Sequence, residues 1–192
     1  MLAFVEILIM FVQLVFGSLL FVAALRIALP MSTTRFSNVI CQFIYKSTNP
    51  VIGPLTRIIP AYRKLSLATV LVAWIIVIAE IAMIALLVGI VPNPLQLLAD
   101  GFVAMVYMLL WMMFWLVLVF ALMSFFSPSY DNPAVEVVYG LADPIMRPFN
   151  KLPPRSLPFS LAPLYAGFAI RVAMLLVGKL AGPLALLAIP RI

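Results

Sequence analysis

The chain has 192 residues, of which 66% are hydrophobic and only 9% are charged, and its mean hydropathy is +1.24. A soluble domain carries about 25% charged residues, so the composition excludes an ordinary water-soluble domain. The net charge of +6 does not indicate a nucleic-acid partner, because the basic residues lie in short segments between apolar runs. With no histidine, one cysteine (Cys41) and no Gly-rich phosphate loop, the sequence predicts no enzyme, no metal site and no cofactor.

Four apolar runs are long enough to cross a bilayer, which takes roughly 20 residues. The sequence predicts membrane helices over Leu2–Leu29, Leu65–Val91, Phe102–Phe126 and Phe159–Gly178. No basic residue precedes the first run, and that run exceeds the roughly 7–15 apolar residues of a signal peptide, so we interpret it as a retained helix. The short apolar tail Leu184–Ile189 is expected either at the membrane interface or packed on the bundle.

Lys and Arg residues concentrate in the first and third loops, and the second loop, Pro92–Asp100, has none. The basic residues of the first loop are Arg35, Lys46, Arg57, Arg63 and Lys64, and those of the third are Arg147, Lys151 and Arg155. By the positive-inside rule these two loops are cytoplasmic, so both termini are predicted to be periplasmic or extracellular.

The two basic loops each contain a short segment with helical hydrophobic periodicity. These segments are Phe36–Lys46 and Ala134–Ala142. Each predicts a short amphipathic helix, either lying at the cytoplasmic interface or folded under the bundle.

An internal repeat relates the two halves of the chain at a separation of 94 residues, the distance from Pro50 to Pro144. The repeated motif residues are Asn49, Pro50, Pro54, Arg57 and Pro60 in the first copy, and Asp143, Pro144, Pro148, Lys151 and Pro154 in the second. Because each copy contains two spans, both should have the same orientation and be related by a pseudo-twofold axis along the membrane normal. We expect one membrane domain over 1–192, with repeats at about 2–91 and 102–180 and a tail at 181–192.

The repeated prolines predict an extended Pro-rich loop before the second span of each repeat. Proline lacks an N–H group and disfavours the α conformation in the residue before it, so Pro50, Pro54 and Pro60 are expected to end one helix and orient the next. The basic residue of each motif, Arg57 or Lys151, either contacts anionic lipid headgroups or serves only as a topological signal.

The repeated pattern (Asn/Asp)-Pro-x-x-x-Pro-x-x-(Arg/Lys)-x-x-Pro, placed before a Ser-led membrane helix, resembles the YggT family over nearly the whole chain. The chain has one basic residue where the family usually has a pair, as in Thr56-Arg57 and Asn150-Lys151, and lacks the usual Asp before Ser66 and Ser160. The resemblance implies a bacterial inner-membrane protein linked to osmotic-stress adaptation, potassium uptake or assembly of membrane complexes.

Two ionisable residues lie well inside predicted spans, Glu80 in the second and Arg171 in the fourth. Intramembrane charges usually face protein or water. Their similar depth and the small-residue stripes beside them predict an ion pair across the pseudo-twofold axis. Separate hydrogen-bonded sites and a neutral Glu80 are the alternatives. Glu6 and Arg26, near opposite ends of the first span, are interpreted as interfacial anchors.

Two functions are compatible with the sequence. The first is an osmotic-stress or assembly factor that binds other membrane proteins or a second copy of itself, within a bilayer with anionic headgroups. The alternative is an ion (potassium) uptake protein or modulator that uses Glu80 and Arg171.

Overall fold

The structure, a computed structural model, describes residues 2–126, 132–152 and 161–189. The described residues form an all-helical protein, as predicted. Its elements are α1 (Leu2–Ala28), the 3-10 turn η1 (Leu29–Met31), α2 (Val39–Ile58), α3 (Leu67–Val88), α4 (Pro94–Phe126), α5 (Pro133–Phe149), α6 (Ala162–Lys179) and α7 (Ala185–Ala188).

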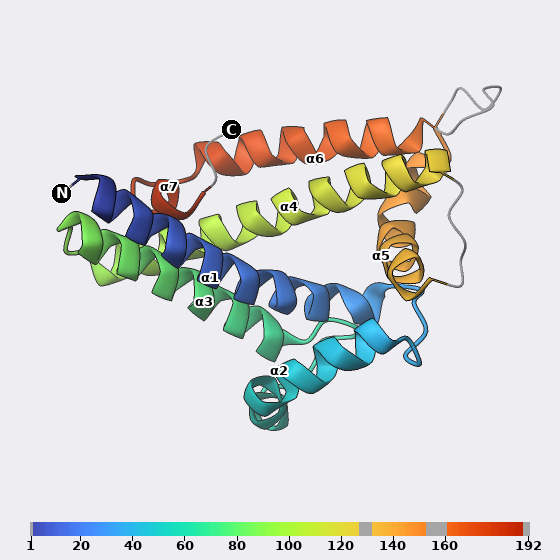
Figure 1. Ribbon diagram of the computed structural model, residues 1–192, viewed down its shortest axis with the longest axis horizontal. Helices are drawn as coiled ribbons and strands as arrows, with labels where there is room; N and C mark the ends of the chain where they lie inside the picture. The colour runs from blue at the N-terminus through green and yellow to red at the C-terminus, as the bar shows by residue number, and fades with distance from the viewer. Residues whose placement is uncertain (1, 127–131, 153–160, 190–192) are drawn as a thin grey trace.

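Four of these helices are long and apolar enough to cross a membrane. They are α1, α3, α4 and α6, which confirms the four predicted spans. All four run along the long axis of the molecule, α1 and α4 in one direction and α3 and α6 in the other (Figure 1). This is the direction that parallel repeats require, although the pseudo-twofold axis itself stays a prediction.

Local signals at the helix ends explain where the spans begin and stop. The Ser66 side chain accepts a hydrogen bond from the Thr69 N–H and caps α3, and α3 ends at Gly89 in the left-handed conformation that glycine adopts without strain. The helix α4 begins at Pro94, eight residues before the predicted Phe102, because Asn93 accepts a hydrogen bond from the Leu95 N–H and Pro94 suits the first turn. The observed loop between α3 and α4 is therefore shorter than the sequence predicted.

The long helices pack as two pairs, α1 with α3 and α4 with α6, and α3 on α4 joins the pairs. One apolar core lies between α1, α3, α4 and α7, and a second lies between α4, α5 and α6. The tail helix α7 packs on α3 and α4. Of the two positions expected for the tail, the structure therefore has the one packed on the bundle. Since α6 packs on α4 and α5 and not mainly on α3, the expected meeting of the α3 and α6 stripes across an axis is wrong.

The predicted extended Pro-rich loops are wrong for four of the six repeated prolines, which lie inside helices. Pro50 and Pro54 are in α2, and Pro144 and Pro148 are in α5. Only the third proline of the first motif acts as predicted, since α2 ends before Pro60 with extended backbone at Ile59. Its counterpart in the second motif, Pro154, lies outside the described residues.

A proline at an interior helix position removes one hydrogen bond and can bend the helix. The two prolines of α2 are four residues apart and therefore share a face, which is exposed, whereas the opposite face buries Cys41, Ile44 and Ile52. Carbonyl groups that lose a helical partner near Pro50 and Pro54 thus face outward, where water can bind them. The helix α2 changes direction along its length (Figure 1).

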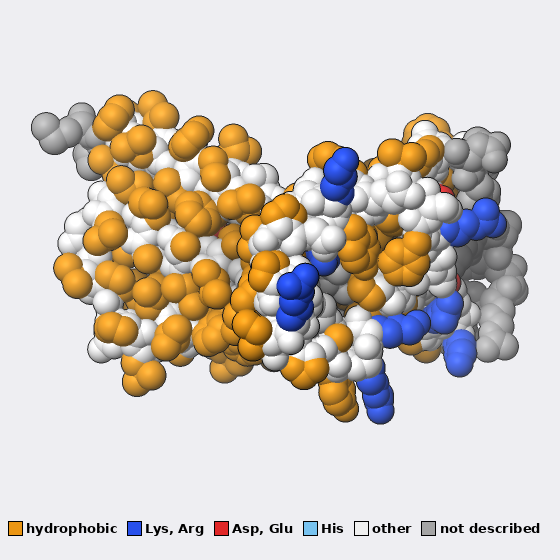
Figure 2. Space-filling model, turned by 90° about the horizontal axis from the view of Figure 1, so that it is seen from below, with side chains coloured by type: hydrophobic (Ala, Val, Ile, Leu, Met, Phe, Trp, Pro, Cys, Tyr) orange, Lys and Arg blue, Asp and Glu red, His pale blue; other side chains and the backbone are white. Residues whose placement is uncertain are grey.

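The helices α2 and α5 lie at the end of the bundle that is distant from both termini (Figure 1). They contact each other, and a third apolar cluster at this end contains Leu29, Cys41, Ile44, Val137 and Leu141. Figure 2 shows the Lys and Arg side chains gathered toward this end, while the other half of the same face is covered by hydrophobic side chains. This separation agrees with the one-sided loop charge; the depth of α2 and α5 in a bilayer stays a prediction.

Candidate functional site

The repeated motif places a polar cluster where α1 meets α2, which we call the first motif corner: Arg26, Tyr45, Thr48 and Asn49. Arg26 Nη1 donates to the Tyr45 carbonyl oxygen at 3.1 Å and to Thr48 Oγ1, and Arg26 Nη2 donates to Asn49 Oδ1 at 3.0 Å. The guanidinium also lies 4.7 Å from the centroid of the Tyr45 ring, a cation–π contact. Three side chains and one carbonyl of a single helix thus surround one cation.

The burial of Arg26 corrects the sequence interpretation of this residue as an interfacial anchor. The residue is 7% exposed, so its guanidinium is enclosed by protein groups rather than by lipid headgroups. It joins the last turn of α1 to the middle of α2, and it donates to a carbonyl in the turn before Pro50. Sequence reasoning missed this cluster, although the repeat pointed to it by matching Tyr45 and Asn49 with Tyr139 and Asp143.

The equivalent place in the second repeat, the second motif corner, consists of Phe120, Tyr139, Ala142 and Asp143. The separation of 94 residues maps Arg26 onto Phe120 and Asn49 onto Asp143. Phe120 packs on Tyr139 with ring centroids 4.9 Å apart in an edge-on arrangement. A neutral ring therefore stands where the first repeat has a guanidinium, and a carboxylate stands where the first repeat has an amide.

A cavity of about 360 Å³ opens at the second motif corner. Its lining residues are Thr33, Phe120, Glu136, Tyr139, Gly140, Asp143, Met146 and Asn150. Two carboxylates and two aromatic rings thus line one space, together with the polar residues Thr33 and Asn150. Such convergent polar groups are typical of ligand sites.

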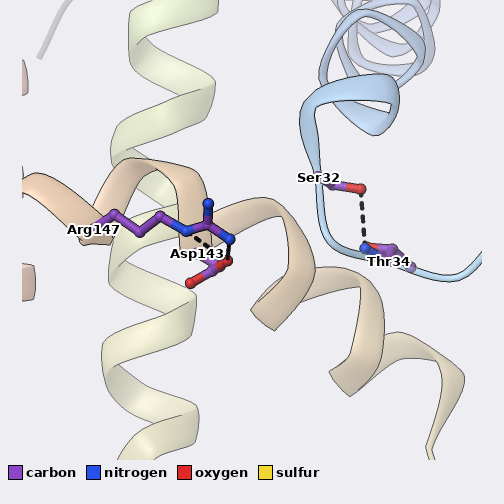
Figure 3. A network of polar contacts seen from close by, with 4 residues as sticks. All are labelled: Ser32, Thr34, Asp143 and Arg147. Carbon is purple, nitrogen blue, oxygen red and sulfur yellow. Dashed lines mark hydrogen bonds and ion pairs between the residues drawn. The ribbon is translucent and has the colours of Figure 1, made fainter.

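Asp143 also belongs to an ion pair on the surface of α5. Arg147 Nη2 lies 2.7 Å from Asp143 Oδ2, and the Arg147 and Asp143 side chains are 65% and 40% exposed. Figure 3 shows these two side chains turned toward each other, with the loop that carries Ser32 and Thr34 drawn alongside. An exposed pair of this kind contributes about 0–1 kcal/mol, so it does not fix the Asp143 carboxylate firmly.

The loop between η1 and α2 is bonded to the start of α5. Glu136 accepts hydrogen bonds from the Arg35 N–H at 3.2 Å and the Asn38 side chain at 2.8 Å, and Asn38 also donates to the Pro133 carbonyl oxygen. The hydrogen bond from the Asn38 side chain, aided by that from the Arg35 backbone, holds the pKa of Glu136 below its usual value. Glu136 therefore stays ionised at neutral pH.

Gly140 permits a close approach of that same loop to α5. A Cβ atom at Gly140 would lie 2.1 Å from Thr34 Oγ1 and 2.9 Å from the Thr34 backbone nitrogen. The Gly140 carbonyl oxygen accepts a hydrogen bond from the Thr33 N–H at 3.2 Å. The lining of the cavity thus includes a contact that only glycine allows.

The structure does not form the predicted ion pair between Glu80 and Arg171. The Glu80 side chain is fully buried, and neither carboxylate oxygen has a hydrogen-bond partner among the described residues. The half-buried Arg171 guanidinium instead lies 5.5 Å from the centroid of the Phe114 ring. The two charges are separated because α6 packs on α4 rather than on α3, so similar depth did not produce contact.

The basic residues of the two motifs lie on exposed surface. The Arg57 side chain at the end of α2 and the Lys151 side chain after α5 are exposed. Their exposure is compatible both with a purely topological role and with contact to lipid headgroups. Within the described residues, no group of three or more His, Cys, Asp or Glu side chains is arranged to hold a metal ion.

One further polar contact fixes the tail to the bundle. The buried Asp100 carboxylate accepts hydrogen bonds from the Gly182 N–H at 3.2 Å and the Leu184 N–H at 3.1 Å. Glu6, its counterpart 94 residues earlier, is exposed. Asp100 is therefore a structural residue, which the prediction of a simple second loop did not anticipate.

Comparison with known proteins agrees with the repeated architecture. The family model described as CCB3/YggT matches residues 1–87 and 99–181. The chain is 30% identical over 175 residues to an uncharacterized protein of Vibrio alginolyticus encoded in the proC 3' region, which covers 90% of this chain and 94% of that protein. It is 36% identical over 133 residues to the uncharacterized protein YggT of Escherichia coli K12, which covers 69% of each chain. No solved structure matches. The chain belongs to the CCB3/YggT family.

Proposed function

We propose that this protein is a multi-pass inner-membrane protein that acts as an assembly or scaffold factor for other membrane proteins, in the service of osmotic-stress adaptation. The observation that carries the proposal is the structural use of the buried polar groups. Arg26, Asn38 and Asp100 each bond to a neighbouring helix, loop or tail, and the cavity described above lies at the motif end. Such polar groups stabilise a bundle and do not line a route across it.

The outer surface of the bundle supports a role in association. Large apolar side chains on α6 are exposed along one face, including Leu164, Phe168 and Leu175 at 67%, 72% and 67%. Lipid or a neighbouring membrane protein can cover such a face. Self-association, or binding of another membrane protein within a bilayer rich in anionic headgroups, is part of this proposal.

Loss of the protein tests the assembly role directly. We expect a deletion strain to contain less of one or more assembled membrane complexes and to grow poorly after a hyperosmotic shift, with both defects restored by the wild-type chain. The variant Glu80→Gln should restore both defects equally well, because this function does not use the Glu80 charge. Normal complexes and normal growth in the deletion strain would contradict the proposal.

An ion-uptake role is the second candidate, because one observation favours it. Glu80 is a buried carboxylic acid without a hydrogen-bond partner, and intramembrane acids often belong to ion or proton sites. Arg171, which the sequence paired with Glu80, would act separately in this candidate. Potassium flux into proteoliposomes that is present for the wild type and lost for Glu80→Gln would favour this candidate over the assembly role.

The proposed orientation places α2 and α5 on the cytoplasmic side and both termini in the periplasm. It is supported by the gathering of basic side chains at the motif end. A reporter enzyme that is active only in the periplasm should be active when inserted near Asn93 and inactive when inserted near Tyr62. A reporter that is active only in the cytoplasm should give the reverse result. The opposite pattern would reverse the orientation.

A further inference from the structure

We propose that the cavity at the second motif corner binds an organic cation, a guanidinium or alkylammonium group, beside Phe120, the neutral ring that stands where the first repeat has the Arg26 guanidinium. The site consists of the Asp143 and Glu136 carboxylates and the rings of Phe120 and Tyr139. It goes beyond the proposed assembly role and does not depend on it.

The chemistry of the lining favours a cation with apolar character. Two carboxylates line the cavity. Glu136 accepts its two hydrogen bonds from neutral groups, the Arg35 N–H and the Asn38 amide, and the charge of the Arg35 side chain is the weakest of the effects on its pKa. Aromatic faces attract cations, most strongly those that are weakly hydrated. A volume of about 360 Å³ is at the lower end of the range of ligand pockets, about 300–1,000 Å³, which suits a small ligand.

The first repeat shows what the motif corner recognises. There a guanidinium lies over Tyr45 and bonds to Asn49, the counterparts of Tyr139 and Asp143. The first repeat therefore combines an internal cation with neutral acceptors, whereas the second combines a neutral ring with an anionic acceptor. Replacing the internal cation by Phe120 and the amide by a carboxylate leaves a charge that a cation from outside can balance.

Arg147 is the competing internal partner for Asp143. It bonds to Asp143 Oδ2 from the exposed side of α5 and is not among the residues that line the cavity. Because both side chains of this pair are substantially exposed, the pair is weak. Arg147 therefore lowers the affinity of the site without filling it.

Two sources can supply the cation, the amine of a phosphatidylethanolamine headgroup or a soluble guanidinium or amine. The motif end carries the exposed basic residues that are expected at headgroup level, so lipid amines would lie within reach. The test below has an arm for each source.

The experiment uses the full chain in nanodiscs of phosphatidylglycerol alone, with thermal unfolding followed by tryptophan fluorescence. Ethylguanidinium chloride is titrated at constant ionic strength, with potassium chloride as the balancing salt. We expect a saturable rise in the Tm of the wild type. Asp143→Asn should weaken the binding about tenfold or more, because it removes the charged acceptor. Glu6→Gln, which removes an exposed acid elsewhere, should leave the response unchanged.

Phe120→Arg provides the most specific variant, because it copies Arg26 into the second repeat. We expect it to raise the Tm and to abolish the response to ethylguanidinium. If this variant does not fold, Asp143→Asn and Arg147→Gln carry the test, and Arg147→Gln should tighten binding. The proposal is wrong if potassium alone raises the Tm equally, if Asp143→Asn binds as tightly as the wild type, or if folded Phe120→Arg still responds.

The second arm replaces half of the phosphatidylglycerol with phosphatidylethanolamine. If the lipid amine is the natural ligand, the wild type should gain stability in these nanodiscs and need more ethylguanidinium for the same response, while Asp143→Asn should show neither change. An unchanged titration curve would assign the site to a soluble cation.

Discussion

The two motif corners occupy equivalent places in the two repeats, yet one is closed by an internal cation and the other contains a cavity. In the first, Arg26 joins α1 to α2 through three hydrogen bonds. In the second, Phe120 contacts α5 through the ring of Tyr139. The comparison shows that a duplicated motif can keep its helices and prolines while the charge at its centre changes position. One corner is specialised for stability, and the other retains space for a ligand.

Removal of the Arg26 cation should have the largest effect on stability. Arg26→Met deletes three charge-assisted hydrogen bonds and leaves Asn49 and Thr48 without their donor, so we expect the free energy of unfolding to fall by about 3 kcal/mol. The free energy of unfolding of Arg26→Lys should lie between that of Arg26→Met and that of the wild type, because lysine keeps the charge but lacks the planar set of guanidinium donors. Denaturant unfolding in detergent measures both losses. A loss below about 0.5 kcal/mol for Arg26→Met would mean that the first corner is not specialised for stability.

The next largest effect on stability should come from the close contact between Gly140 and the loop that carries Thr34. Gly140→Ala places a Cβ against backbone atoms of Thr34, and overpacking of this kind costs about 1–3 kcal/mol. The equivalent residue of the first repeat, Lys46, is exposed, so Lys46→Ala should change stability by less than about 0.5 kcal/mol. Thermal unfolding of the two variants side by side checks this contrast. Equal Tm changes would show that the loop can move away from Gly140 at little cost.

The sequence predicted the spans well and the corners poorly, for different physical reasons. A membrane span is specified by the hydropathy of about 20 consecutive residues, so α1 and α3 could be read directly. Whether Pro50 can lie inside a helix depends on whether the carbonyl group that loses its helical donor faces outward, where water can bind it. No local sequence pattern reveals this. The Arg26 cluster also depends on tertiary packing, and only the matching of Tyr45 and Asn49 with Tyr139 and Asp143 offered a signal.

The prediction of a Glu80–Arg171 pair failed for a related reason. Depth along a helix follows from residue counting, but the partner of a helix face depends on which helices pack together. In this fold α6 lies on α4, and Arg171 therefore meets Phe114. The burial of Glu80, by contrast, agreed with the expectation that an intramembrane acid faces the protein.

At the end of the bundle opposite the motif corners, Asp100 and its counterpart Glu6 also differ, since only Asp100 is bonded to a neighbouring segment. Asp100→Ala removes the acceptor of two tail N–H groups and should lower the free energy of unfolding by about 1–3 kcal/mol, with a value near 1.5 kcal/mol expected since water can reach part of the tail. Glu6→Ala, at the equivalent exposed position, should have almost no effect. Limited proteolysis of the tail should accelerate for Asp100→Ala only. Protection of the tail in Asp100→Ala would show that α7 is held by its apolar contacts alone.

The smallest effect should be the pH dependence of the loop attachment at Glu136. Its pKa is below the usual 4.5 in the folded state, so its contribution to stability is fully present above the unfolded pKa and is lost as the pH falls through the folded pKa. Hydrogen exchange at the Arg35 N–H should therefore accelerate relative to other loop amides on acidification below about pH 4. Glu136→Gln should remove this dependence, and the equivalent Gln42 of the first repeat should show none. An unchanged pH profile in Glu136→Gln would assign the effect to another group.

The central claim is that the first corner is held by Arg26 and Asn49 acting together, whereas Phe120 and Asp143 act independently. Two double-mutant cycles test it most directly: Arg26→Met with Asn49→Ala, and Phe120→Met with Asp143→Ala, each measured by denaturant unfolding in the same detergent. We predict a coupling free energy of about 1 kcal/mol or more in the first cycle and additivity within about 0.5 kcal/mol in the second. Additivity in the first cycle, or equal coupling in both, would contradict the account.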